Sequence, residues 1–257
     1  MNAAIMKVNN LSINFGGVKA VDNVSLDIRQ GSITSIIGPN GAGKTTFFNI
    51  ISGIYKPTSG TATFDGKEIT GMKQHEVSKL GISRTFQNIR LFDQLDILRN
   101  VQTAMDARAD YSVLEALLNL PKKWRTDREN VEKSMQLLKL VGLEGNAQDK
   151  PGSLPYGKQR RLELARALAS YPKLLLLDEP AAGLNPTELD DFINLIRAIQ
   201  KMFPITILLI EHRLHVVNSL SERVYVLNFG KLLAEGTVED VKANQEVITA
   251  YMGEEDN

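Results

Sequence analysis

Short apolar runs along the chain predict a set of β-strands. Runs rich in β-forming residues and bounded by glycine occupy residues 7–15, 24–28 and 32–37. Two later runs, over residues 174–177 and 205–210, are apolar without interruption instead of alternating with polar residues. Uninterrupted apolar strands are typical of a parallel sheet that helices cover on both faces. The pattern therefore predicts the α/β fold class.

Helical spacing of apolar residues separates these runs. Residues 187–202 carry a stripe made by Leu189, Ile193, Ile196 and Ile199, which predicts a helix. From residue 96 to residue 143 helical spacing dominates, and the apolar positions that show it are Leu98, Val101, Met105, Val131, Met135, Leu138 and Val141. This middle stretch is predicted to be a helical insertion.

Two further local patterns concern the insertion and the C-terminal tail. Behind Pro121 the insertion carries its one basic cluster, made by Lys122, Lys123, Trp124, Arg125 and Arg128. We expect a solvated loop between two helices there, and a contact with a partner or with lipid headgroups is the alternative. In the tail, Thr237 followed by Glu239 and Asp240 predicts the N-cap of the first of two short helices.

Charge, cysteine content and hydropathy narrow the function classes. The 257 residues hold 30 Lys and Arg against 30 Asp and Glu, so no overall field attracts a polyanion, and nucleic acid is not an expected partner. The lack of cysteine excludes disulfides, thiolate metal sites and cysteine nucleophiles. No apolar run approaches the roughly 20 residues of a membrane span, and residues 1–12 show no signal-peptide pattern. We therefore expect a soluble, cytoplasmic protein.

A glycine-rich loop follows the third predicted strand and opens a helix. Residues 38–45 read Gly-Pro-Asn-Gly-Ala-Gly-Lys-Thr, which matches the phosphate-binding P-loop pattern in full. Backbone N–H groups and the helix dipole of such a loop bind phosphates; Lys44 would reach the β- and γ-phosphates, and the Thr45 hydroxyl would bind Mg²⁺. The predicted nucleotide-binding residues of the loop are Gly38, Asn40, Gly41, Ala42, Gly43, Lys44, Thr45 and Thr46.

Two carboxylates follow the uninterrupted run at residues 174–177. Asp178 and Glu179 would lie at the carboxyl end of a buried strand, which is where open α/β sheets bind ligands. Asp178 fits a Mg²⁺-binding role, and Glu179 could polarise the water that attacks a γ-phosphate. The alternative, that both residues cap the next helix, is weakened by Pro180, which follows directly.

A third segment lies between these two halves and reads Leu-Pro-Tyr-Gly-Lys-Gln-Arg-Arg-Leu-Glu over residues 154–163. Together with the P-loop and Asp178-Glu179, it resembles the signature region of the ABC ATPases, whose general pattern is Leu-Ser-Gly-Gly-Gln. The resemblance covers the whole chain. It implies an ABC nucleotide-binding domain of the P-loop NTPase (RecA-like) fold that binds ATP and Mg²⁺. The implied parts are an ATP-binding core (1–87 and 170–236), a helical subdomain with the signature (88–169) and a C-terminal helical extension (237–257).

The other functional positions of the family map onto single residues. Phe15 resembles the aromatic residue that stacks on adenine, with Val18 nearby. Gln87 resembles the Q-loop glutamine that contacts Mg²⁺ and the attacking water, and His212 falls at the switch histidine that contacts the γ-phosphate. The resemblance thus implies a catalytic set of Lys44, Gln87, Glu179 and His212 and a metal-binding set of Thr45, Gln87 and Asp178.

The signature departs from the general pattern of the family. Pro155 stands where most members have serine, so a hydroxyl and an N–H that could meet the γ-phosphate are missing. Gly157 and the helix N-terminus must then supply most of that contact. The signature residues expected to act on the opposite subunit's site are Leu154, Tyr156, Gly157 and Lys158, of which Tyr156 and Lys158 replace a glycine and a glutamine. Two further departures from aspartate are Asn185 in the D-loop and Arg213 after His212.

Several stretches narrow the resemblance within the family. They are Phe15-Gly16-Gly17, residues 84–88, the Tyr-Gly-x-Gln-Arg-Arg core of the signature, Ile210-Glu211-His212, residues 247–253 and the helical insertion around residues 111–128. All are similar to the LivG-type ATPases of branched-chain amino-acid importers. That resemblance implies a peripheral subunit at the cytoplasmic face of the cell membrane that powers uptake of leucine, isoleucine and valine. The implied partners are a second ATPase subunit, identical or homologous, two membrane permeases and, through them, an extracytoplasmic substrate-binding protein.

The number of motifs bears on the mechanism. One P-loop and one signature occur in the chain, and in this family the signature completes the site of the opposite subunit. Two ATP molecules would therefore be held between two subunits, and hydrolysis would release the closed dimer. By family analogy a permease helix would dock beside Gln87 at residues 88–100. The apolar residues Ile89, Leu91 and Phe92 fit such a contact, and their burial under the insertion is equally compatible.

Three other functions compete with this one. An ATPase of a related urea or amide importer would share the subfamily pattern. A non-transport ABC protein usually carries paired cassettes or long coiled-coil insertions, for which 257 residues leave no room. A small-molecule kinase would use the P-loop but has no need of residues 154–161.

Overall fold

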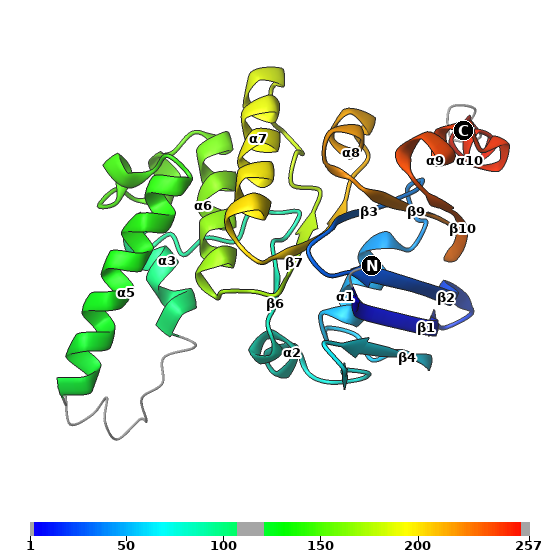
Figure 1. Cartoon of the computed structure of the whole chain (residues 1–257), viewed down its shortest axis with the longest axis horizontal. Helices are drawn as coiled ribbons and strands as arrows, with labels where there is room; N and C mark the ends of the chain where they lie inside the picture. Colours follow the sequence, from blue (N-terminus) through cyan, green and yellow to red (C-terminus); the bar gives the residue numbers. More distant parts are fainter. Residues whose placement is uncertain (1–2, 107–120, 253–257) are drawn as a thin grey trace.

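The computed structural model describes residues 3–106 and 121–252 of the chain (Figure 1). Its strands are β1 (Ala4–Phe15), β2 (Val18–Arg29), β3 (Ile33–Ile37), β4 (Ser59–Phe64), β5 (Lys67–Glu68), β6 (Ile82–Arg84), β7 (Leu174–Asp178), β8 (Thr206–Ile210), β9 (Arg223–Asn228) and β10 (Lys231–Gly236). Its α-helices are α1 (Lys44–Ile51), α2 (Gln74–Leu80), α3 (Ile97–Asp106), α5 (Pro121–Leu140), α6 (Tyr156–Ala169), α7 (Pro186–Met202), α8 (Leu214–Leu220), α9 (Val238–Ala243) and α10 (Gln245–Met252).

The strands form two sheets. The larger has six strands in the order β10-β9-β3-β8-β7-β6, and its strands are parallel except for β10, which pairs antiparallel with β9. The smaller has four strands in the order β2-β1-β4-β5, all antiparallel. Strands β7 and β8 are buried at every position, as the uninterrupted runs predicted, because helices and the second sheet cover both faces of the parallel sheet.

One core holds the P-loop helix between the two sheets. The apolar side chains Phe47, Phe48 and Ile51 of α1 pack with residues from both sheets, among them Val8 of β1 and Leu208 of β8. Since α1 begins at Lys44, this packing fixes the start of the helix against the carboxyl ends of the parallel strands.

A second core lies on the other face of the parallel sheet. Figure 1 shows α3, α5, α6 and α7 gathered at the end of the molecule away from the four-stranded sheet. Ile97 and Leu138 of the helical region share one core with Leu175 and Ile207 of the sheet and with Ile196 of α7. The helical region therefore packs on the sheet as one continuous apolar cluster, and the subdomain boundaries given above stay a prediction.

The structure corrects two expectations about the insertion. The basic cluster does not lie in a loop, because helix α5 begins at Pro121 and runs through it to Leu140. Proline is tolerated in the first turn of a helix, and Lys and Arg are good helix formers, so the cluster opens the helix. Val131 is not on the buried stripe of α5; its neighbour Asn130 is buried instead, and Ser134 donates to the sulfur of Met105 at 3.4 Å.

The C-terminal tail follows its predicted pattern. The Thr237 hydroxyl accepts a hydrogen bond from the Asp240 N–H and caps α9, and α10 follows. Residues 253–257 and residues 107–120, on which part of the subfamily resemblance rests, lie outside the described residues. Within the described ranges, no helix is both long and apolar enough to span a membrane.

Candidate functional site

The loop between β3 and α1 needs its glycines for two close backbone approaches. Gly38 has φ 148°, and a Cβ there would lie 2.0 Å from the carbonyl oxygen of Leu227. Gly43 caps α1 at φ 96°, and a Cβ there would lie 2.3 Å from the carbonyl oxygen of Ala20. Any other residue at either position would collide with backbone, so the sheet and the loop hold each other in place.

A cavity of about 290 Å³ opens at this loop, and we call it the P-loop cleft. It is lined by Ala20, residues 40–46, Gln87, Glu179 and His212. The cleft therefore unites all four predicted catalytic residues with the predicted nucleotide-binding residues of the loop other than Gly38. They meet because β7 and β8 are adjacent parallel strands that end at the same edge of the sheet. The other two predicted nucleotide-binding residues, Phe15 and Val18, do not line the cleft.

Lys44 lines the cleft and is almost fully buried. Its ammonium donates to the carbonyl oxygens of Gly38 at 2.6 Å and Pro39 at 2.7 Å. An ammonium has three N–H donors, and its hydrogen bond to a charged phosphate oxygen is stronger than one to a neutral carbonyl. The position of Lys44 therefore favours contact with a phosphate bound in the cleft.

Glu179 occupies the middle of the predicted catalytic set. Its Oε1 lies 2.9 Å from Nε2 of His212, and its Oε2 accepts from Nε2 of Gln87 at 2.8 Å. Its backbone has φ 47°, a conformation that non-glycine residues seldom adopt. Such conformations concentrate at functional sites, where the surrounding structure over-determines them, and here the Glu179 N–H is fixed by the carbonyl of Ile210 at 3.0 Å.

Asp178 lies deeper, at the end of β7, and it lines a second cavity of about 430 Å³ together with Thr45 and Gln87. Its Oδ2 accepts from Nη2 of Arg84 at 2.7 Å, whereas its Oδ1 is buried with no hydrogen-bond partner among the described residues. Burial raises the pKa of the Asp178 carboxyl above its ordinary value, and Arg84 acts in the opposite direction. Because Thr45 and Gln87 also line the P-loop cleft, the two cavities adjoin.

Two buried residues that support the site were not predicted to do so. Glu211 accepts from the N–H groups of Ala181 at 3.0 Å, His212 at 3.2 Å and Arg213 at 3.4 Å. Burial raises the pKa of Glu211, and these three donors oppose the rise. Arg160 donates to the carbonyl oxygens of Phe86, at 2.9 Å, and of Gln87. Glu211 precedes the predicted switch histidine and Arg160 lies in the signature segment, but no local sequence pattern shows which distant backbone groups these two side chains contact.

Phe15 ends β1 and Val18 begins β2, on either side of the turn between these strands, and neither lines the P-loop cleft. Both side chains are exposed, 47% for Phe15 and 68% for Val18. The Phe15 ring meets Tyr55 edge to face at 5.3 Å between centroids, and Tyr55 lines the cavity that holds Asp178. An exposed aromatic ring beside the cavity is suited to stacking on a base.

The signature residues lie at the start of α6 and do not line the P-loop cleft. Pro155 is the N-cap of α6, and Gly157 follows in its first turn, where a Cβ would lie 2.7 Å from Oε1 of Glu188. A separate cavity of about 250 Å³ is lined by Pro155, Gly157 and Lys158 but by no residue of the P-loop cleft. The Leu154 side chain is buried in the helical core. The hydroxyl of Tyr156 accepts from Arg160 at 2.8 Å.

Both further departures from the family pattern have structural roles here. Asn185 is the N-cap of α7, and its side chain accepts from the N–H of Glu188 at 2.9 Å. Asparagine and aspartate cap helices about equally well, so the exchange preserves the helix start. Arg213 donates to the carbonyl oxygen of Leu184 at 3.2 Å, which ties the segment after His212 to the D-loop.

Comparison with known proteins identifies the family. The family model described as "ABC transporter" matches residues 21–182, and the model described as "Branched-chain amino acid ATP-binding cassette transporter" matches residues 231–257. The chain therefore belongs to the ABC transporter family as an ATP-binding cassette, and it is an ATPase of that family.

Relatives match the chain along its full length. The high-affinity branched-chain amino acid transport ATP-binding protein BraF of Pseudomonas aeruginosa is 43% identical over 99% of this chain and 100% of its own. The protein LivG of Escherichia coli, described in the same words, is 41% identical over the same shares. The crystal structure of an ATP-binding cassette of an ABC transporter in its ADP conformation superposes with a TM-score of 0.85, at 33% identity, over 98% of this chain and 100% of that one. The predicted LivG-type resemblance and fold class are thus confirmed.

Proposed function

We propose that this chain is the ATP-hydrolysing subunit of an importer of branched-chain amino acids. The observation that carries the proposal is the contact of Glu179 with both Gln87 and His212 beside an intact P-loop. The cargo, leucine, isoleucine or valine, is supported by the full-length similarity to BraF and LivG, which are branched-chain amino acid transport proteins. The residues of the P-loop cleft do not indicate which amino acid is transported.

The roles of the site residues follow from their positions in the P-loop cleft. Glu179 acts as the general base that takes a proton from the attacking water, and Gln87 and His212 orient its carboxylate. Each carboxylate oxygen accepts one of these contacts and has a further lone pair with which to accept from the attacking water. Lys44 and the N–H groups of residues 40–46 hold the phosphates. Phe15, with Val18 beside it, supplies the stacking surface for adenine.

Mg²⁺ fits the second cavity. The described residues contain no group of three or more His, Asp or Glu that could hold a metal alone, but Mg²⁺ in nucleotide sites needs only one or two carboxylates plus phosphates and water. Asp178 offers an unpartnered oxygen there, and Thr45 and Gln87 line the same cavity. When bound, the ion neutralises charge that develops on the phosphates.

A second ATPase subunit is needed to complete the site. The signature residues Gly157 and Lys158 line a cavity that shares no residue with the P-loop cleft, which supports a signature that acts on the nucleotide bound by another chain. An identical or homologous chain would supply the missing signature, as the family resemblance implies. Opposed P-loop and signature surfaces would then enclose two ATP molecules, and their γ-phosphates would hold the dimer closed.

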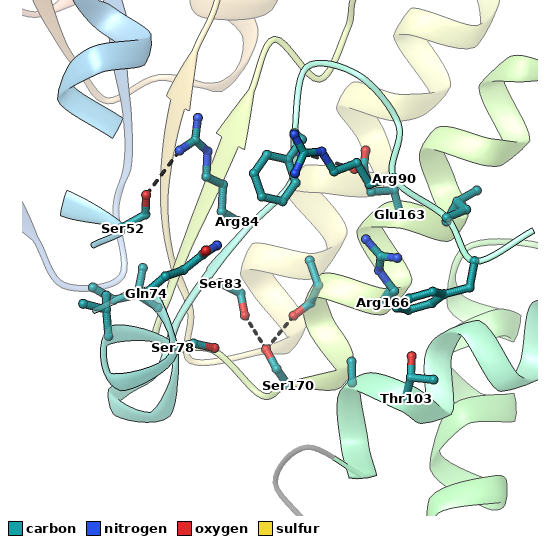
Figure 2. Close-up of a pocket in the computed structure, with 17 residues that line it drawn as sticks. Ser52, Gln74, Ser78, Ser83, Arg84, Arg90, Thr103, Glu163, Arg166 and Ser170 are labelled. Carbon is teal, nitrogen blue, oxygen red and sulfur yellow. Dashed lines mark hydrogen bonds between the residues drawn. The ribbon is translucent and has the colours of Figure 1, made fainter. Parts of the chain in front are cut away.

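A cavity of about 510 Å³ lies between α2, β6, α3 and α6, and we call it the α2–α6 groove (Figure 2). Its walls are largely apolar, and the guanidinium of Arg166 lies over the Phe92 ring at 5.4 Å from its centroid. Arg90 lies over Phe86 at 4.3 Å. Arg84, Arg90 and Arg166 line the groove with a single carboxylate, Glu163, so arginines outnumber carboxylates there. Such a groove suits a helix that presents apolar side chains and a carboxylate, and we assign it to a permease subunit.

A pair of variants tests this assignment. The Phe92 side chain is 51% exposed, so Phe92→Glu alters the groove without a large cost to the fold. It should abolish co-purification with permease subunits while ATP binding persists. Met202→Glu, at an exposed position at the end of α7, is the control and should keep the association. Equal recovery of permease by both variants would contradict the assignment.

The function as a whole is tested by purification from membranes. Subunits that co-purify with the chain from detergent-solubilised membranes would be identified, and ATP hydrolysis would be assayed with and without them. The expected result is recovery of two permeases and a second ATPase, with turnover stimulated by a binding protein loaded with leucine. This result would fit a peripheral subunit at the cytoplasmic face of the membrane. Stimulation by urea or an amide instead would assign the cargo of a related importer, and recovery of no membrane subunit would contradict the transport role.

A further inference from the structure

Arg84 makes a buried ion pair with the carboxylate at the end of the neighbouring strand. Arg84 ends β6 and Asp178 ends β7, and these strands pair in parallel. The distance between Nη2 and Oδ2 is 2.7 Å, and the two side chains are 6% and 3% exposed. Arg84 and Asp178 both line the cavity that Thr45 also lines.

The guanidinium is held from the P-loop helix as well. Nη1 of Arg84 donates to Oδ1 of Asn49 at 2.7 Å and to the hydroxyl of Ser52 at 3.2 Å, and both residues belong to α1 or its C-cap. Figure 2 shows Arg84 reaching across to Ser52 at one end of the α2–α6 groove. The rings of Phe48 and Phe86 flank the guanidinium at 5.6 and 5.3 Å. Arg84 therefore has little freedom to turn.

This arrangement leaves one carboxylate oxygen for another partner. Arg84 occupies Oδ2, and Oδ1 is buried without any hydrogen-bond partner among the described residues. A buried, unpartnered carboxylate oxygen is costly to leave in place. A buried ion pair is also a poor source of stability, because desolvation of the two charges offsets their attraction. The pair is better explained by what the oriented carboxylate can bind.

We propose that Arg84 is a positioning residue that fixes Asp178 so that Oδ1 faces Mg²⁺ in the nucleotide site. The inference rests on the proposed Mg²⁺–ATP site. Arg84 does not touch the ion; it holds the carboxylate in one rotamer, and Asn49 holds Arg84. Hydrogen-bond partners of metal ligands commonly change metal affinity by about 10- to 100-fold when they are removed.

Binding of ADP, measured by calorimetry in EDTA and at rising MgCl₂, tests the inference without any turnover. Arg84→Lys keeps the charge but loses the planar fork with which Arg84 donates to Asn49 and Asp178 from two different nitrogens. We expect it to bind ADP normally in EDTA and to need about tenfold more MgCl₂ for the same gain in affinity. Asn49→Ala keeps Arg84 and removes only its anchor, so a smaller shift in the same direction is expected. Arg197→Lys, on α7, is the matched control, because Arg197 donates to the carbonyl oxygen of Ser219 and lines neither the cavity of Asp178 nor the α2–α6 groove.

The outcomes separate this inference from the proposed function. Unchanged Mg²⁺ dependence in both Arg84→Lys and Asn49→Ala would overturn the role of Arg84 and leave the metal site standing. If Arg84→Lys fails to fold, Asn49→Ala decides by itself. If Mg²⁺ fails to strengthen ADP binding even in the unaltered protein, the proposed metal site is wrong, and the inference falls with it.

Discussion

Oε1 of Glu179 lies 2.9 Å from Nε2 of His212 across the ends of two adjacent parallel strands. The carbonyl of Ile210, two residues before His212, also accepts the N–H of Glu179, at 3.0 Å. The backbone contact fixes the distance between the strands, and the side-chain contact fixes the direction of the carboxylate. His212 therefore positions Glu179 as well as being the residue expected to contact the γ-phosphate.

Glu179→Gln should abolish turnover while ATP still holds the subunits together. The amide keeps the shape of the carboxylate but cannot take a proton, and loss of a general base costs about 10²- to 10⁴-fold in rate. Phosphate release measures the rate, and light scattering with ATP and the partner subunit measures the dimer. His215→Ala, which removes only an exposed contact with Asp190, should leave both unchanged. Detection of monomers alone for Glu179→Gln would contradict the base assignment.

Lys44→Ala should lose nucleotide binding itself. Each hydrogen bond from a charged donor contributes about 1.5–3 kcal/mol, so ATP affinity should fall by about tenfold or more. Calorimetric titration with ATP provides the measurement. Lys67→Ala, on exposed strand β5, is the matched control with the same change of charge. An ATP affinity of Lys44→Ala equal to that of the control would show that Lys44 does not reach the phosphates.

Pro155→Ser should preserve or raise ATPase activity. Comparison with Pro155→Ala separates the effect of a serine cap on stability from the effect of losing the proline ring. Pro155 caps α6 with no side-chain hydrogen bond, and a serine at this position can accept from the backbone N–H three residues on. Pro155→Ala loses the ring but gains no cap. We therefore expect Pro155→Ser to be more stable than Pro155→Ala by about 1 kcal/mol in thermal unfolding. A large loss of activity in Pro155→Ser would show that the proline shapes the signature in another way.

The pH dependence of stability should carry a contribution from Glu211. Burial raises the pKa of this carboxyl above its ordinary value of 4.5, so between 4.5 and the raised pKa the folded protein binds more protons than the unfolded chain. The contribution of Glu211 to the free energy of unfolding must therefore fall as pH rises through that window. Urea unfolding compared with Glu211→Gln isolates the effect. The free energy of unfolding of the unaltered protein, minus that of the variant, should be largest below pH 4.5 and decline above it. A difference independent of pH would contradict this.

Local patterns predicted the strands and helices that carry the motifs. The run at residues 174–177 became β7, and the stripe of Leu189, Ile193, Ile196 and Ile199 became the buried face of α7. The basic cluster was wrongly predicted to lie in a loop because charged residues occur both in loops and on the solvent-exposed surface of helices. What distinguishes a helix from a loop here is the packing of the segment against other elements, and those elements are distant in sequence.

The sequence by itself determined the chemical groups of this protein: the P-loop, the paired carboxylates Asp178 and Glu179, and the helix-opening signature. Each of these is a run of adjacent residues whose backbone geometry and chemistry are local. Only the tertiary structure decided which groups meet. Arg84 and Asp178 are 94 residues apart, and Gln87 and Glu179 are 92 apart. Such contacts exist because parallel strand pairing brings the ends of β6, β7 and β8 to one edge of the sheet, and no local pattern records the order in which those strands pair.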